Sequence, residues 1–155
     1  MSLTYQSGYL TSKEANIWFL RKKKSNQSEI ARILNVSRQA IHKTLLRIDD
    51  KIKHALIDAA ETNKLEIKKI DPINGLMKAY SPAQKVQAII SLTKANGIKI
   101  WYMYKVNCME CTHYTTCKNM LISEAKERGI QINDNLVVPT DLALDIFSKY
   151  FEELE

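Results

Sequence analysis

Apolar residues recur at helical spacing through the first sixty positions of the chain, and residues that cap helices stand where each helix should begin. Thr11 with Glu14 matches a capping box, in which two residues three positions apart satisfy each other's backbone amides. Asn26 with Glu29 repeats this pattern. We therefore predict one helix after Thr11 and a second, short helix after Asn26, with the basic run 21–24 between them.

The second helix is followed by the signals of a tight turn and of a third helix. Asn35 stands where the helix must stop, since asparagine tolerates the left-handed conformation. Val36 is the single apolar residue of the turn and is expected to fill the gap between two crossing helices, and Ser37 caps the third helix. With the small Ala31 at the crossing, residues 26–47 predict a helix-turn-helix, although any two amphipathic helices joined by a polar turn share part of this pattern.

Opposite its apolar stripe, the third helix has a polar face rich in hydrogen-bond donors. Arginine, glutamine, histidine and lysine are suited to base edges and phosphates in a DNA groove. With the capping serine, this face comprises Ser37, Arg38, Gln39, His42, Lys43 and Arg47. The preceding basic run adds Lys22, Lys23 and Lys24, which either stabilise the C-terminal end of the first helix or contact DNA phosphates.

Residues 26–45, NQSEIARILNVSRQAIHKTL, resemble the helix-turn-helix of region four of bacterial sigma factors and of archaeal Tfx-like regulators. By position, this resemblance implies that Arg38, Gln39 and Lys43 face bases and that His42 lies nearer the DNA backbone. Asn35 departs from the glycine usual in that turn but adopts the same conformation. The resemblance covers about the first third of the chain and implies nothing about the remainder.

The distribution of charge agrees with a nucleic-acid partner. Residues 1–70 hold 14 Lys or Arg and 7 Asp or Glu, whereas residues 71–155 hold 9 and 10. Such a field steers a protein towards polyphosphate and supplies the sequence-independent part of the affinity. The 45% hydrophobic and 26% charged composition is ordinary for a folded protein, and without a secretion signal or a long apolar run we expect a cytoplasmic location.

The helical pattern continues beyond Arg47 to about residue 63 without Gly or Pro. Its apolar residues are spaced four, three, four, three, four, as in a coiled coil: Ile41, Leu45, Ile48, Ile52, Ala55 and Ala59. This stripe either forms the seam of a homodimer or packs on the C-terminal half of the same chain.

The C-terminal half is expected to be a small α/β domain, which makes the fold class mostly α (α+β). The domains predicted are a helix-turn-helix domain with a long stem helix at 1–63, a linker at 64–80 and a cysteine-cluster domain at 81–155. Within the last, a helix is expected from Ser81 to Ala95, a strand over Ile98–Val106 that is covered on both sides or lies at a subunit interface, a helix beginning at Cys117 and a final helix after Pro139.

The three cysteines cluster as C-x2-C-x5-C, which favours metal or redox chemistry over a disulfide framework. The candidate ligands are Cys108, Cys111, Cys117 and His113. Zinc fits a Cys3His ligand set, whereas the spacing resembles that of iron-sulfur proteins such as the WhiB-like regulators, which implies a cluster that lacks its fourth cysteine here. We expect Cys117, at a helix N-terminus, to deprotonate most easily. The alternative is a purely structural role, in which the cysteines are small buried apolar residues that bind no metal.

These patterns together predict a DNA-binding transcriptional regulator whose cysteine cluster binds an iron-sulfur cluster or zinc and senses redox state. The expected partners are double-stranded DNA and a second copy of the chain, with RNA polymerase as a further candidate. No enzyme activity is expected, because the chain lacks a Gly-rich phosphate loop and a compact set of metal-binding carboxylates. The alternatives are a DNA-processing enzyme or accessory subunit with a structural zinc site, and a helix-turn-helix that binds protein.

Overall fold

The computed structural model describes residues 9–23, 25–133, 135 and 138–154. Within these residues it combines α-helices with one four-stranded antiparallel sheet of strand order β1-β2-β3-β4, which confirms the expected mostly α (α+β) class. The elements in chain order are α2 (Ser12–Lys22), α3 (Gln27–Leu34), α4 (Arg38–Thr62), β1 (Glu66–Asp71), β2 (Leu76–Ser81), β3 (Val86–Thr93), β4 (Gly97–Tyr102), the short 3-10 helix η1 (Cys108–Glu110), α5 (Tyr114–Glu127) and α6 (Pro139–Phe147).

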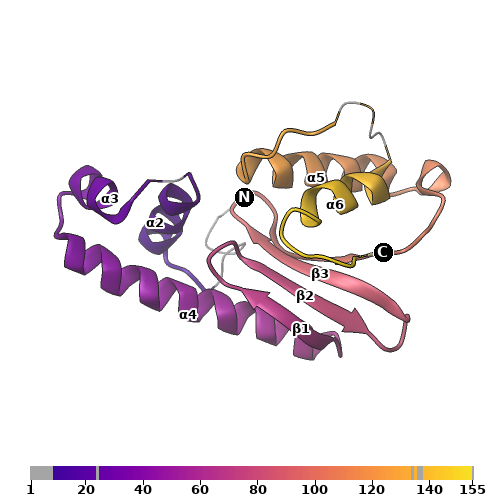
Figure 1. The fold of residues 1–155 in the computed structure, drawn as a ribbon, viewed down its shortest axis with the longest axis horizontal. Coiled ribbons are helices and arrows are strands. Elements are labelled where there is room, and N and C mark those ends of the chain that lie inside the picture. The colour runs from indigo at the N-terminus through magenta and orange to yellow at the C-terminus, as the bar shows by residue number, and fades with distance from the viewer. Residues whose placement is uncertain (1–8, 24, 134, 136–137, 155) are drawn as a thin grey trace.

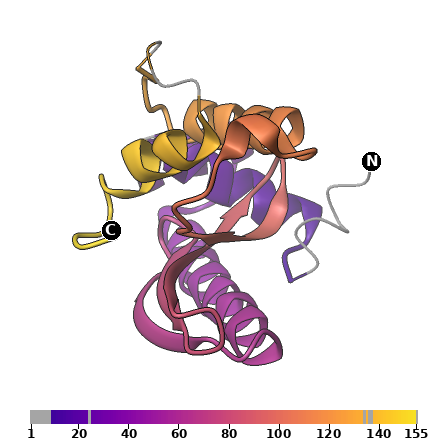
Figure 2. The same cartoon turned by 90° about the vertical axis from the view of Figure 1, so that its right-hand side faces the viewer.

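The sheet lies between two helical layers (Figures 1 and 2). The C-terminal half of α4 covers one face, and α5 with α6 covers the other. Alternate residues of the central strand β3 enter separate cores: Ile90 packs with α2, α3 and α4, whereas Ile89 packs with α5 and α6. The helix-turn-helix therefore shares a continuous core with the sheet.

The local signals that start and stop the N-terminal helices are confirmed. Thr11 with Glu14 and Asn26 with Glu29 form complete capping boxes, and the Ser37 side chain accepts a hydrogen bond from the Ala40 amide. Asn35 ends α3 in the left-handed conformation, at φ 53° and ψ 48°. Each of these side chains hydrogen-bonds to a backbone group no more than three residues away. A short stretch of sequence is therefore enough to predict where each helix begins.

Two expectations about residues 64–95 are wrong. Residues 64–80, read as a linker, contain β1 and β2, which pair with each other across a turn at 72–75. The helix expected from Ser81 to Ala95 is instead a turn followed by β3. Ser81 does act as a cap, but of a turn: its hydroxyl accepts from the Gln84 amide and its carbonyl from the Lys85 amide.

The long helix after the turn is confirmed, and its apolar stripe packs within the chain. Ile41, Leu45, Ile48 and Ile52 belong to the core that α4 shares with α2, α3 and the sheet. Ala55 is also wholly buried, whereas Ala59 is only partly buried. The stripe is therefore buried within the chain, partly against the N-terminal helices α2 and α3 and partly against the sheet of the C-terminal half. A homodimer stays a prediction, and this seam is not free to form it.

Trp18 joins α2, the helix before the helix-turn-helix, to the sheet. Its side chain is 1% exposed, and its indole Nε1 donates to the Ile73 carbonyl at 3.3 Å. Gly75 follows in the same turn with φ +63°, and a Cβ there would lie 2.8 Å from Trp18 Cζ2. Only glycine combines this backbone conformation with so close an approach, so the β1–β2 turn and α2 are fitted to one another.

Candidate DNA-binding surface and cysteine segment

The N-terminal part of α4 presents an exposed surface of donors. Arg38, Gln39, His42 and Lys43 are all exposed, and residues 37–47 contain no acidic side chain. His42 Nδ1 lies 3.2 Å from Gln27 Nε2 of α3, so the two helices meet at the edge of this face. We call Arg38, Gln39, His42 and Lys43 the reading face; the structure brings these four sequence-predicted residues together, with their cap Ser37 at the helix start.

Beside the reading face, a cavity of about 640 Å³ opens between the start of α3 and α4. Arg38 and His42 line it from α4, and Ser25 with the first residues of α3 line it from the other side. The amides at the start of α3 that its capping box leaves free attract anions, and here they stand beside the Arg38 guanidinium; the Asp49 carboxylate also lines the cavity and pairs with Arg21. This arrangement suits a DNA phosphate next to the groove that the reading face would enter.

Arg47 lies apart from the reading face. Its Nε is 3.4 Å from Glu14 Oε2, and Lys51 Nζ is 2.7 Å from Glu14 Oε1, so both cations lean towards α2. Burial alone would raise the pKa of Glu14, but hydrogen bonds from Lys51 and from Thr11 outweigh it and lower the pKa from 4.5 to about 2. Arg47 keeps 59% of its side chain exposed and has a structural partner as well as access to solvent.

The three lysines of the basic run have different positions. The expectation that Lys22 contacts a DNA phosphate is wrong. Only 5% of its side chain is exposed, and its Nζ pairs with Glu127 Oε2 at 2.8 Å. Lys23 is exposed, with Nζ 4.6 Å from the Phe19 ring centroid. Lys24 lies outside the described residues. The position of a residue around the helix axis decides whether its side chain points into the protein or towards solvent. The run of consecutive lysines does not by itself show which of them points inward.

Sequence reasoning missed the apolar part of this surface. Val36, expected to fill the gap between the helices, is 38% exposed, because Ile30 and Ala31 already occupy the crossing. Ile33 and Leu46 are each 58% exposed. Apolar side chains beside donors are suited to thymine methyl groups. The sequence did contain an indication of this apolar part, because the position of Leu46 around the axis of α4 places it among the polar residues of that helix.

The cysteine segment does not form a metal site in the described structure. Cys108 is buried with its Sγ 3.9 Å from Thr140 Oγ1, whereas Cys111 and His113 are exposed. Among the described residues, no three His, Cys, Asp or Glu side chains converge as ligands. Zinc and iron-sulfur sites both need such convergence, so a metal at these cysteines stays a prediction that requires the side chains to rearrange.

Cys117 also differs from expectation. The helix begins at Tyr114 rather than at Cys117, and the Cys117 amide already donates to the His113 carbonyl at 2.9 Å. Burial raises the pKa of the Cys117 thiol, nearby Cys111 and Cys108 raise it further, and Lys99 opposes them. The pKa of Cys117 is therefore raised, opposite to the lowering that its assumed place at a helix start suggested.

No family model, curated protein or solved structure matches this chain. Within the described residues, none of the helices has the length and apolar character needed to cross a membrane. The argument for function therefore rests on the residues of the surface itself.

Proposed function

We propose that the protein binds double-stranded DNA in a sequence-specific manner and regulates transcription. The observation that carries this proposal is the reading face: four exposed donors on one side of a capped helix, next to the start of α3 and without an acidic neighbour between 37 and 47. A set of donors without acidic side chains suits phosphates and base edges, which together present mainly hydrogen-bond acceptors and negative charge.

In this proposal the N-terminal half of α4 lies in the major groove. Arg38, Gln39 and Lys43 read base edges, with Arg38 suited to guanine and Gln39 to adenine. Leu46 and Ile33 add contacts to thymine methyl groups at the rim. His42 and the start of α3 hold a phosphate, which fixes the position of the helix along the groove.

Selection of preferred sites from random duplexes, followed by titration of the variants at several salt concentrations, tests the proposal. Arg38→Ala and Gln39→Ala should each weaken the preferred site by about 1–3 kcal/mol and relax its sequence preference. Lys149→Ala, on the remote α6 side of the sheet, is the matched control and should change neither. Equal weakening of preferred and random DNA by Arg38→Ala would rule out base reading by this face.

The cysteine segment is not part of the proposal, because its donors do not converge. A DNA-processing enzyme is likewise not favoured by any cluster of catalytic side chains in the described residues.

A further inference from the structure

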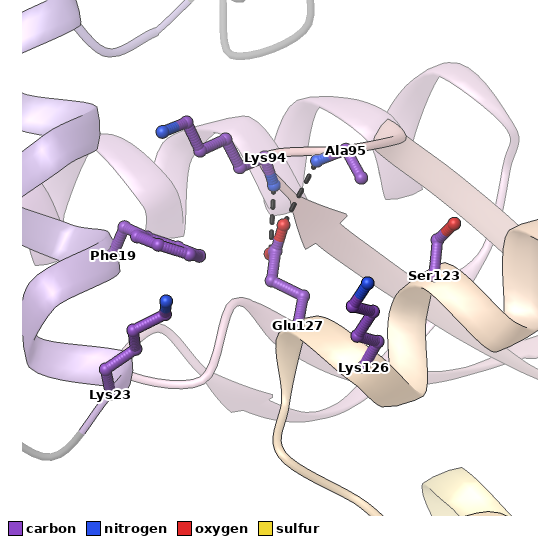
Figure 3. Close-up of a pocket in the computed structure, with 7 residues that line it drawn as sticks. All are labelled: Phe19, Lys23, Lys94, Ala95, Ser123, Lys126 and Glu127. Carbon is purple, nitrogen blue, oxygen red and sulfur yellow. Dashed lines mark hydrogen bonds between the residues drawn. The ribbon is translucent and has the colours of Figure 1, made fainter.

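A second cavity, of about 450 Å³, lies on the opposite side of α2 from α4, between α2, the β3–β4 turn and α5 (Figure 3). Its walls come from three separate parts of the chain, and we call it the lysine pocket. The residues that line it are Phe19, Lys23, Lys94, Ala95, Ser123, Lys126 and Glu127. Its volume falls within the range of small-molecule sites, about 300–1,000 Å³.

Three ammonium groups surround this space. Lys23 Nζ and Lys94 Nζ lie 4.6 and 4.8 Å from the centroid of the Phe19 ring, and Lys126 reaches towards the pocket from α5. Among the described residues, none of these three lysines has a carboxylate within ion-pair distance. A cation held only by an aromatic face gains less than it gains from a charged hydrogen-bond acceptor.

The carboxylate in the pocket wall, Glu127, is fully engaged. Its Oε2 accepts from Lys22 Nζ at 2.8 Å and from the Lys94 amide at 2.9 Å, and its Oε1 accepts from the Ala95 amide at 3.1 Å. These bonds hold the turn against α5, as the dashed lines of Figure 3 show for the two amides. Because buried Lys22 neutralises Glu127, the other three lysines give the pocket a positive charge.

We propose that the lysine pocket binds a small phosphorylated molecule that carries a flat ring, of the nucleoside diphosphate class. Phosphoryl oxygens would replace the Phe19 ring as the partner of the ammonium groups, which gives shorter and stronger hydrogen bonds. The ring would lie against Phe19, Ala95 and the methylene groups of the lysines. Inorganic phosphate would fill only a small part of the cavity and leave these apolar walls bare.

This proposal goes beyond DNA binding and does not depend on it. The lysine pocket shares no residue with the reading face. It does lie against α2, the helix that precedes the helix-turn-helix and packs on it, so a molecule bound there would contact both α2 and α5.

Calorimetric titration of the full chain at one fixed low salt concentration tests the proposal, with ADP, pyrophosphate and adenosine as probes. ADP should bind, and Lys94→Met and Lys126→Met should each raise its Kd about tenfold or more, since each removes one charged contact. Phe19→Leu should weaken ADP while leaving pyrophosphate nearly unchanged. Lys149→Met is the matched control for charge, and circular dichroism checks that each variant is folded.

Four results would overturn the proposal. They are no ADP binding to folded protein at millimolar concentration; equal weakening by Lys149→Met and Lys94→Met; pyrophosphate binding as tightly as ADP; and displacement of ADP by random duplex DNA that depends on Lys126, which would make the pocket part of a DNA surface. Arg38→Ala should leave ADP binding intact, so that failure of the DNA proposal is seen separately.

Discussion

Lys22 Nζ and Glu127 Oε2 lie 2.8 Å apart, with only 5 and 7% of the two side chains exposed. The pair joins α2 to α5 across 105 positions of sequence. Burial lowers the pKa of Lys22, with a further contribution from Arg128, while Glu127 acts in the opposite direction. A buried pair of this kind is costly to break, because removal of one partner leaves the other charge without compensation.

Lys22→Met should therefore lower the free energy of unfolding by about 3–5 kcal/mol, since Glu127 would keep its charge with only amide partners. Urea denaturation followed by circular dichroism measures this change. Lys23→Met, at the exposed neighbouring position, should alter stability by no more than about 0.5 kcal/mol. Equal effects of the two substitutions would show that Lys22 is not buried against α5.

Asn35→Ala should destabilise the protein by about 1–2 kcal/mol, because alanine is strained at the positive φ of this position. Asn35→Gly should be close to neutral, since glycine adopts the left-handed conformation without a Cβ penalty. Thermal unfolding of the two variants provides the comparison. A smaller loss for alanine than for glycine would contradict the left-handed end of α3.

The pKa of Glu14 predicts a loss of stability in acid. The folded pKa of about 2 lies below the ordinary value of 4.5, so the folded state holds the carboxylate ionised more strongly than the unfolded state does. This stabilisation, on the order of 3 kcal/mol, is fully present above pH 4.5 and is lost as the pH falls towards 2. Glu14→Gln should remove that part of the pH dependence, as urea denaturation at a series of pH values would measure. Parallel stability curves for the two proteins over this interval would refute it.

The thiols should differ in their reaction with iodoacetamide. Cys111 is exposed and should be alkylated first at neutral pH, whereas Cys108 is buried and Cys117 has a raised pKa. Peptide mass spectrometry over a time course gives the order, and alkylation in denaturant shows the intrinsic reactivities. If Cys117 reacted fastest in the folded protein, the pKa direction given for it would be wrong.

The sequence predicted those features that depend on neighbouring residues. The caps at Thr11, Asn26 and Ser37 and the left-handed Asn35 were read correctly, because each is decided within a single helical turn. The exposed donors from Arg38 to Lys43 followed from the phase of the same helix.

The sheet was predicted poorly because β3 is covered on both faces. Ile89 and Ile90 are each wholly buried in different cores, so the strand lacks the alternation of apolar and polar residues that marks a half-exposed strand. Ser81 and Pro82 then resembled a helix start. For β4 a strand was predicted, but it ends at Tyr102 rather than at Val106; Ile98 and Ile100 pack on one core and Trp101 on the other.

The cysteine segment and the lysine pocket depend on contacts between distant parts of the chain. Close spacing in the sequence suggested shared ligands, yet Cys108 turns towards Thr140 while Cys111 faces solvent. Lys94 and Phe19 lie 75 positions apart, and only the folded sheet brings them to one cavity. No local pattern carries such information.

The continuity of α4 has a mechanical consequence. Its 25 residues form one helix. The first turns carry the reading face, and the later turns, around Ile52, pack against the sheet. Arg38 lies about 21 Å along the helix axis from Ile52, so a tilt of about 10° at the sheet would move it by about 4 Å. That displacement is close to the ~3.4 Å rise between base pairs. In the proposed DNA complex, a modest repacking of the sheet would thus move the reading face along the DNA by about one base pair, because α4 is one continuous helix.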